Sequence, residues 1–123
     1  MTQAVPGRAK LMLYEQFHVG IADDPFKDTK LVVSNDEFWV SKKDKGVVEW
    51  FCERNHKHGQ NFPCFTIKFD KNGSPFKSNE FISNHLGYAR SDEITVEPGD
   101  KIYHYRVVAH GKQDLDPGGG VRP

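Results

Sequence analysis

The stretch CERNHKHGQNFPC, residues 52–64, contains both cysteines of the chain and two of its six histidines. Thiolate and imidazole are the protein ligands that tetrahedral zinc prefers, and both also bind copper. One interpretation is therefore a metalloprotein with a zinc or copper site. Its candidate ligands are Cys52, His56, His58, Cys64 and, from further along the chain, His110.

The spacing of these residues argues against such a site. Zinc motifs usually supply cysteines as a CxxC-type pair and histidines three to five residues apart, whereas the order here is Cys-x3-His-x-His-x5-Cys. Alternation along the flanking strands places Cys52 on the face of Trp50, but Cys64 on the outward face with Lys68. The two thiols are then not expected to converge, and we interpret residues 53–61 as a solvated polar loop without a cofactor.

Other residues with chemical potential have structural interpretations. Aromatic side chains could form a stacking surface for a carbohydrate, but in a β-sandwich aromatics mostly belong to the core. The aromatics in question are Trp39, Trp50, Tyr103 and Tyr105. The strand histidines His18, His104 and His110 are interpreted as structural rather than catalytic.

The sequence contains no recognisable catalytic constellation, which predicts that the protein is not an enzyme. The SDE stretch at 91–93 has no partner histidine at motif spacing. The PGGG tract at 117–120 lacks the Lys-Ser/Thr pair of a phosphate-binding loop. The lysine-rich run at 42–45 mixes both charges, as solvated turns do.

Length and composition indicate one domain without a global charge bias. The 123 residues suffice for a single core, with residues 1–9 and 117–123 expected to be flexible. Lysine plus arginine and aspartate plus glutamate both number 17, so the basic footprint of a nucleic-acid-binding protein is missing. No apolar run approaches the roughly 20 residues that span a bilayer, and the N-terminus lacks a secretory-signal pattern. We expect a cytoplasmic protein without membrane partners, whose two cysteines are free thiols.

Period-two alternation between turn residues predicts an all-β fold. A first strand is expected over residues 10–19. Further short strands are predicted in TKLVVS, EFWVSK, VVEWFCE, FTIKF, EITV and KIYHYRVVAH. In FTIKF, Phe65, Ile67 and Phe69 share one face, which is typical of a half-buried strand. About seven short strands with these turns favour a Greek-key β-sandwich over an open sheet.

A resemblance to the cupredoxin pattern covers roughly residues 37–121, and three stretches within it, in this order, carry the resemblance. VVEWFCE resembles the cupredoxin strand in which an apolar residue precedes tryptophan. FTIKFDKNGSPFKSNEF is similar to the strand that carries the first histidine ligand and to the loop beyond it. EITVEPGDKIYHYRVVAHG resembles the segment that contains the cysteine and the second histidine ligand. The resemblance implies a cupredoxin-like, immunoglobulin-like sandwich.

The resemblance also implies that the type 1 copper site is missing. The first-histidine position falls on Phe65, the cysteine position on Val107 and the second-histidine position on His110, and no methionine lies near the axial position. Type 1 copper needs one thiolate and two imidazoles. The chain then looks like small bacterial proteins of this fold, and we expect a non-catalytic module that binds a protein or small ligand through its end loops. The alternatives are the metalloprotein and a carbohydrate-binding sandwich.

Overall fold

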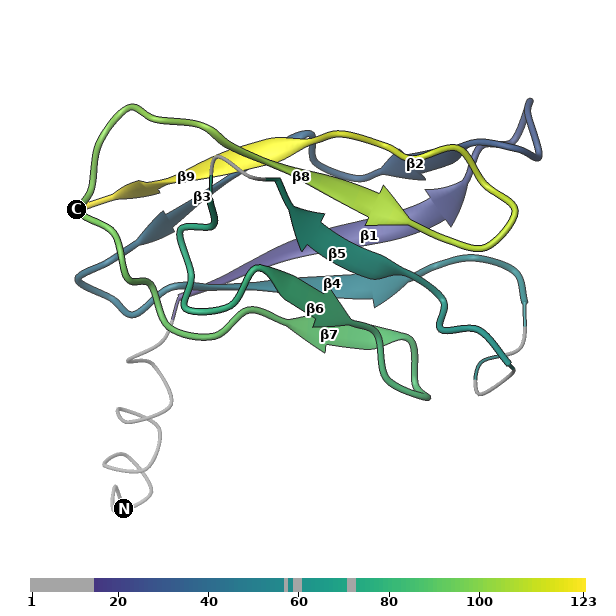
Figure 1. The fold of residues 1–123 in the computed structure, drawn as a ribbon, viewed down its shortest axis with the longest axis horizontal. Coiled ribbons are helices and arrows are strands. Elements are labelled where there is room, and N and C mark those ends of the chain that lie inside the picture. Colours follow the sequence, from purple (N-terminus) through teal and green to yellow (C-terminus); the bar gives the residue numbers. More distant parts are fainter. Residues whose placement is uncertain (1–14, 57, 59–60, 71–72) are drawn as a thin grey trace, which may run out of the picture.

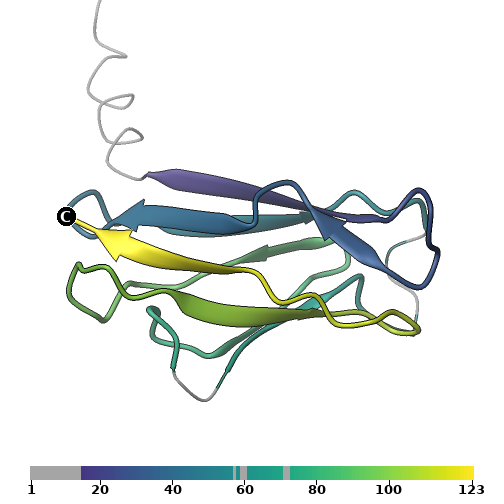
Figure 2. The ribbon, with the colours of Figure 1, turned by 90° about the horizontal axis from the view of Figure 1, so that it is seen from above.

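The computed structural model describes residues 15–56, 58, 61–70 and 73–123, and every regular element among them is a β-strand. The strands form two sheets that pack against each other, as Figures 1 and 2 show. The predicted all-β sandwich is therefore confirmed, with nine strands in place of about seven. Residues 1–9, for which we predicted flexibility, lie outside the described part of the chain.

The chain switches repeatedly between the two sheets. The first sheet has the order β2-β1-β4-β7 and contains β1 (Gln16–Asp23), β2 (Leu31–Val33), β4 (Val47–Cys52) and β7 (Tyr88–Arg90). The second has the order β3-β9-β8-β5-β6 and contains β3 (Glu37–Ser41), β5 (Thr66–Phe69), β6 (Glu80–Ile82), β8 (Tyr103–Val108) and β9 (Gly118–Arg122). The pairs β1–β4 and β3–β9 are parallel, and the other paired strands are antiparallel.

Alternating apolar residues of both sheets fill the core. Trp50 on β4 stacks on Phe81 with 5.7 Å between ring centroids, and its Nε1 donates a hydrogen bond of 3.3 Å to Tyr105 Oη. Burial raises the pKa of Tyr105 to about 12, so this phenol is a neutral partner for the indole at physiological pH. Trp50, Tyr103 and Tyr105 are core residues as predicted. Because they are buried, these three side chains cannot form the carbohydrate-stacking surface that their residue types allow.

The flexible tail predicted for residues 117–123 is wrong, because this segment supplies β9. The strand lies between β3 and β8, and its residues 118–121 are buried. A Cβ atom on Gly119 would lie 2.3 Å from the Phe38 ring, and one on Gly120 would lie 2.3 Å from the Trp39 ring. The glycine tract lets these two rings lie directly on the backbone of a central strand.

Switching between sheets gathers loops at the two ends of the sandwich. The β4–β5 connection, which contains residues 53–65, lies at one end. The β3–β4 turn lies at the opposite end, near the C-terminus (Figure 1). The β4–β5 connection therefore runs from the end of β4 in the first sheet to the start of β5 in the second. Its cysteine and histidine side chains are held between these two strand ends.

Candidate metal centre

A disulfide between Cys52 and Cys64 joins the two sheets at this end. Cys52 is the last residue of β4, Cys64 lies two residues before β5, and their Cα atoms are 6.2 Å apart. The predictions of free thiols and of divergent cysteines are therefore wrong. The alternation rule does not hold at Cys64, because the strand begins only at Thr66 and the neighbouring residues Cys64 and Phe65 are both buried.

The four residues of the opening stretch come together in space. The ligand atoms of Cys52, His56, His58 and Cys64 all lie within 4.8 Å of one another. The edges of a tetrahedron with zinc–nitrogen and zinc–sulfur bonds of ordinary length measure about 3.3–3.8 Å. Small side-chain rotations would thus bring the four atoms to tetrahedral positions once the sulfurs are separated. His110 is not part of this group.

His58 has a buried polar atom without a hydrogen-bond partner among the described residues. This atom is its Nε2, which neither accepts nor donates a hydrogen bond in that part of the chain. The ring is held against the β6–β7 turn, since a Cβ atom added to Gly87 would lie 2.6 Å from His58 Cε1 and 2.7 Å from Cys52 Cβ. A buried imidazole nitrogen with no partner costs free energy unless something else satisfies it. A metal ion would do so.

His56 is the exposed member of the cluster. Its Nε2 lies 3.3 Å from Cys52 Sγ, and the centroids of the His56 and His58 rings are 5.4 Å apart. Partial burial lowers the pKa of His56, and the charges of Arg54 and His58 lower it further, against the opposing effect of Asp23. The neutral imidazole, which is the form that binds metals, is favoured.

Arg54 anchors the loop that carries both histidines. Its Nε donates to Asp23 Oδ1 at 2.9 Å and its Nη1 to the Cys64 carbonyl oxygen at 2.9 Å. Burial raises the pKa of Asp23, but hydrogen bonds and charges from Arg54 and Lys112 outweigh that effect and lower it overall. Asp23 is therefore an anion that fixes Arg54, and Arg54 in turn places a positive charge beside the cysteines.

The residues that the sequence resemblance aligns with type 1 copper ligands do not fit a copper ion. Phe65 and Val107 are both 0% exposed and belong to the apolar core. His110 is exposed at the end of the sandwich and stacks on Phe62, with 3.9 Å between centroids and an interplanar angle of 4°. Apolar side chains fill the volume in which type 1 copper would need a thiolate and an imidazole.

Crowding at Gly87 can be tested against a glycine with the same backbone conformation. Gly87 has φ +76° and Gly111 has φ +75°, but nothing lies within 4 Å of a Cβ added to Gly111. Gly111→Ala should therefore cost only backbone strain, about 1–2 kcal/mol. Gly87→Ala should cost about 1–3 kcal/mol more, because it also displaces His58 and Cys52. Urea denaturation of the oxidised proteins measures the difference, and equal losses would contradict this account of the His58 position.

The outer face of the first sheet carries a second polar and aromatic group that the sequence patterns did not reveal. Glu49 is only 6% exposed although it points away from the core. It accepts a hydrogen bond of 2.9 Å from Tyr88 Oη and lies 3.1 Å from His18 Nε2. Phe51 lies beside them, with its centroid 5.3 Å from that of Tyr88. Burial, and then the hydrogen bond and charge of Glu49, raise the pKa of Tyr88, so this phenol is not an activated nucleophile.

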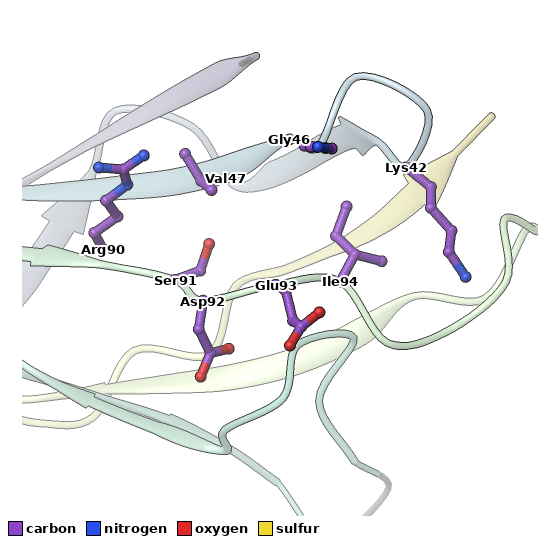
Figure 3. A pocket seen from close by; sticks show the side chains of 9 residues that line it. Lys42, Gly46, Val47, Arg90, Ser91, Asp92, Glu93 and Ile94 are labelled. Carbon is purple, nitrogen blue, oxygen red and sulfur yellow. The ribbon is translucent and has the colours of Figure 1, made fainter. Parts of the chain in front are cut away.

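A cavity of about 480 Å³ opens at the opposite end of the sandwich, under the β3–β4 turn (Figure 3). Its lining consists of Lys42, Lys45, Gly46, Val47, Arg90, Ser91, Asp92, Glu93 and Ile94. Lys42 is paired with Glu97 at 3.0 Å, and Ser91 Oγ accepts a hydrogen bond from the Val48 amide. Three basic and two acidic side chains line it, so its charge selects no class of ligand.

Comparisons with known proteins leave the centre to be interpreted from its own chemistry. No family model and no curated protein matches the chain. Over the described residues, no helix has the length and apolar character needed to cross a membrane. The arrangement of Cys52, His56, His58 and Cys64 is the densest cluster of metal-ligating side chains in the part of the chain described.

Proposed function

We propose that the protein is a non-catalytic β-sandwich module that binds one zinc ion through Cys52, His56, His58 and Cys64 when the two cysteines are reduced. The convergence of these four ligand atoms within 4.8 Å carries the proposal. The buried Nε2 of His58 supports it independently, because this atom has no hydrogen-bond partner among the described residues.

The ligand set favours zinc in a closed, structural site. Two thiolates and two imidazoles in tetrahedral array suit zinc, and Cu(I) is the alternative ion because it also accepts soft sulfur ligands. Four protein ligands leave no position for water or substrate, in contrast to catalytic zinc sites with three. The ion would tie the end of β4 to the start of β5, the same two points that the disulfide joins.

The reduced form belongs in a reducing compartment. In the cytosol, glutathione and thioredoxin keep thiols reduced, and we propose the cytoplasm as the location in which the zinc form is resident. We also propose that the sandwich is cupredoxin-like, which the two-sheet arrangement and the inward placement of Phe65 and Val107 support. It includes no type 1 copper.

Zinc titration of the reduced protein tests the proposal. The protein is reduced with a phosphine, freed of metal, and titrated with zinc in competition with a chromophoric chelator. One equivalent should bind tightly, and thermal stability should rise because the ion binds only the folded state. A reduced protein that is folded by circular dichroism and binds no zinc would overturn the proposal.

Single histidine variants give the matched control. His58→Asn should weaken zinc binding more than about 100-fold, since loss of even an outer-shell partner of a metal ligand costs roughly 10–100-fold. His104→Asn changes an exposed histidine outside the cluster and should leave the affinity unchanged. Equal affinities of the two variants would show that zinc binds elsewhere. Parallel titration with Cu(I) ranks the two ions.

Carbohydrate binding is a second candidate, on the outer face of the first sheet. The ring pair of Phe51 and Tyr88 lies beside Glu49, and sugars are bound by aromatic faces next to hydrogen-bonding side chains. A glycan screen with the parent protein and with Tyr88→Ala tests this surface. Binding that survives the Tyr88 change would exclude it.

A further inference from the structure

We propose that the Cys52–Cys64 pair makes this centre a redox switch, in which the disulfide and bound zinc exclude each other and peroxide releases the ion. The inference rests on the proposed zinc function and adds its regulation. Its starting point is that both sulfurs of the disulfide belong to the cluster of four ligand atoms. A thiolate binds zinc, whereas a sulfur already bonded to a second sulfur does not offer that charge.

The backbone suits both states of the pair. The Cα atoms of Cys52 and Cys64 are 6.2 Å apart, within the range of about 4.4–6.8 Å at which cysteines pair without backbone movement. The backbone on both sides is also fixed: the Cys52 amide donates to the Gly87 carbonyl at 2.7 Å, and the Cys64 carbonyl accepts from Arg54 Nη1. Switching therefore needs rotation of two side chains and no rearrangement of the sheets.

The two cysteines differ in exposure, which sets the order of events. Cys52 is half-buried beside the exposed His56, whereas Cys64 is only 4% exposed. A small oxidant reaches Cys52 from solvent, and Cys64 lies behind it as the resolving cysteine. A low-molecular-weight peroxide fits this approach, since reactive cysteines are accessible ones with a second cysteine nearby.

The chemistry balances as a two-electron oxidation by hydrogen peroxide. The Cys52 thiolate attacks one peroxide oxygen, the O–O bond breaks, and hydroxide leaves as water after protonation, which gives a sulfenic acid. The Cys64 thiolate then attacks that sulfur and displaces its hydroxyl group as a second water, which forms the S–S bond. Two thiolates lose two electrons, and peroxide takes up those electrons with two protons. His56 and His58 alone are left as ligands.

The experiment uses the reduced, zinc-loaded full chain. Hydrogen peroxide is added in small portions, zinc is followed with a chromophoric indicator, and free thiols are counted by mass spectrometry after alkylation. One zinc should be released for every two thiols lost, with a disulfide between Cys52 and Cys64 in the digest. Phosphine reduction should then restore the original affinity. Oxidised protein titrated directly should bind zinc more than about 100-fold more weakly.

The outcomes separate this inference from the zinc proposal. If the reduced protein binds no zinc, the proposed function itself fails, and the switch fails with it. If reduced and oxidised proteins bind zinc equally, zinc binding stands and the switch is wrong. Release without the disulfide, with sulfinic or sulfonic products instead, would also overturn the switch, because that loss is not reversed by a phosphine.

Discussion

A chain that ends at Asp116 should fail to fold. The truncation removes β9, which pairs with β3 from Glu37↔Gly118 to Ser41↔Arg122 and with β8 at Tyr103↔Gly119 and His104↔Gly118. It leaves β3 and β8 without these backbone partners, and each hydrogen-bonding group left unpaired in the interior costs about 1–3 kcal/mol. It also removes Val121, which is 1% exposed, from the core. Together these losses are expected to exceed the roughly 5–15 kcal/mol by which a domain is stable.

Circular dichroism and a proton–nitrogen correlation spectrum of the truncated chain measure this outcome. Both should show an unfolded or molten protein at a temperature where the parent is native. The matched control removes Pro123 alone, whose carbonyl accepts a hydrogen bond of 2.8 Å from Ser41 Oγ. That change should cost about 1 kcal/mol, the ordinary net value of one hydrogen bond. Native-like dispersion in the longer truncation would mean that the two sheets hold together without β9.

The C-terminal strand shows where composition misleads. A Pro-Gly-Gly-Gly tract is typical of a flexible segment, because glycine loses the most backbone entropy on folding. In this fold the missing side chains are what the position requires, since the rings of Phe38 and Trp39 lie on Gly119 and Gly120. The signal that could have been used is the apolar Val121 directly after the glycines. Which strands would flank it depends on contacts between distant parts of the chain.

Alternation predicted the inward faces of the central strands well, because it is local. Trp50 on β4, Ile67 on β5 and Tyr105 on β8 are buried as their parity indicates. The same rule failed at Cys64, since alternation holds only where the backbone is extended and β5 begins at Thr66. Residue type alone identifies the four candidate metal ligands in the sequence. Their convergence could not be predicted, because it depends on how two sheets meet.

Removal of the Phe65 side chain should produce the largest loss of stability of any single substitution considered for this protein. Phe65 is 0% exposed in the apolar core, and its backbone is fixed by hydrogen bonds of 3.1 Å to Ser83 Oγ and from the Ser83 amide. Alanine keeps those backbone bonds and leaves a cavity, so the free energy of unfolding should fall by about 3–5 kcal/mol. Val107→Ala deletes less volume and should cost about 2 kcal/mol.

Phe26→Ala is the matched control, because that ring is 93% exposed and its loss should change stability by no more than about 0.5 kcal/mol. Urea denaturation of all three variants in the disulfide form gives the comparison without a contribution from metal. The result also bears on copper, since the sequence resemblance would place type 1 copper ligands at Phe65 and Val107. Losses of only a few tenths of a kcal/mol would mean that these side chains do not fill that volume, and the argument against type 1 copper would fail. Losses of the expected size would exclude type 1 copper at Phe65 and Val107, whereas the Cys52–Cys64 end brings together the metal-ligating cluster found among the described residues.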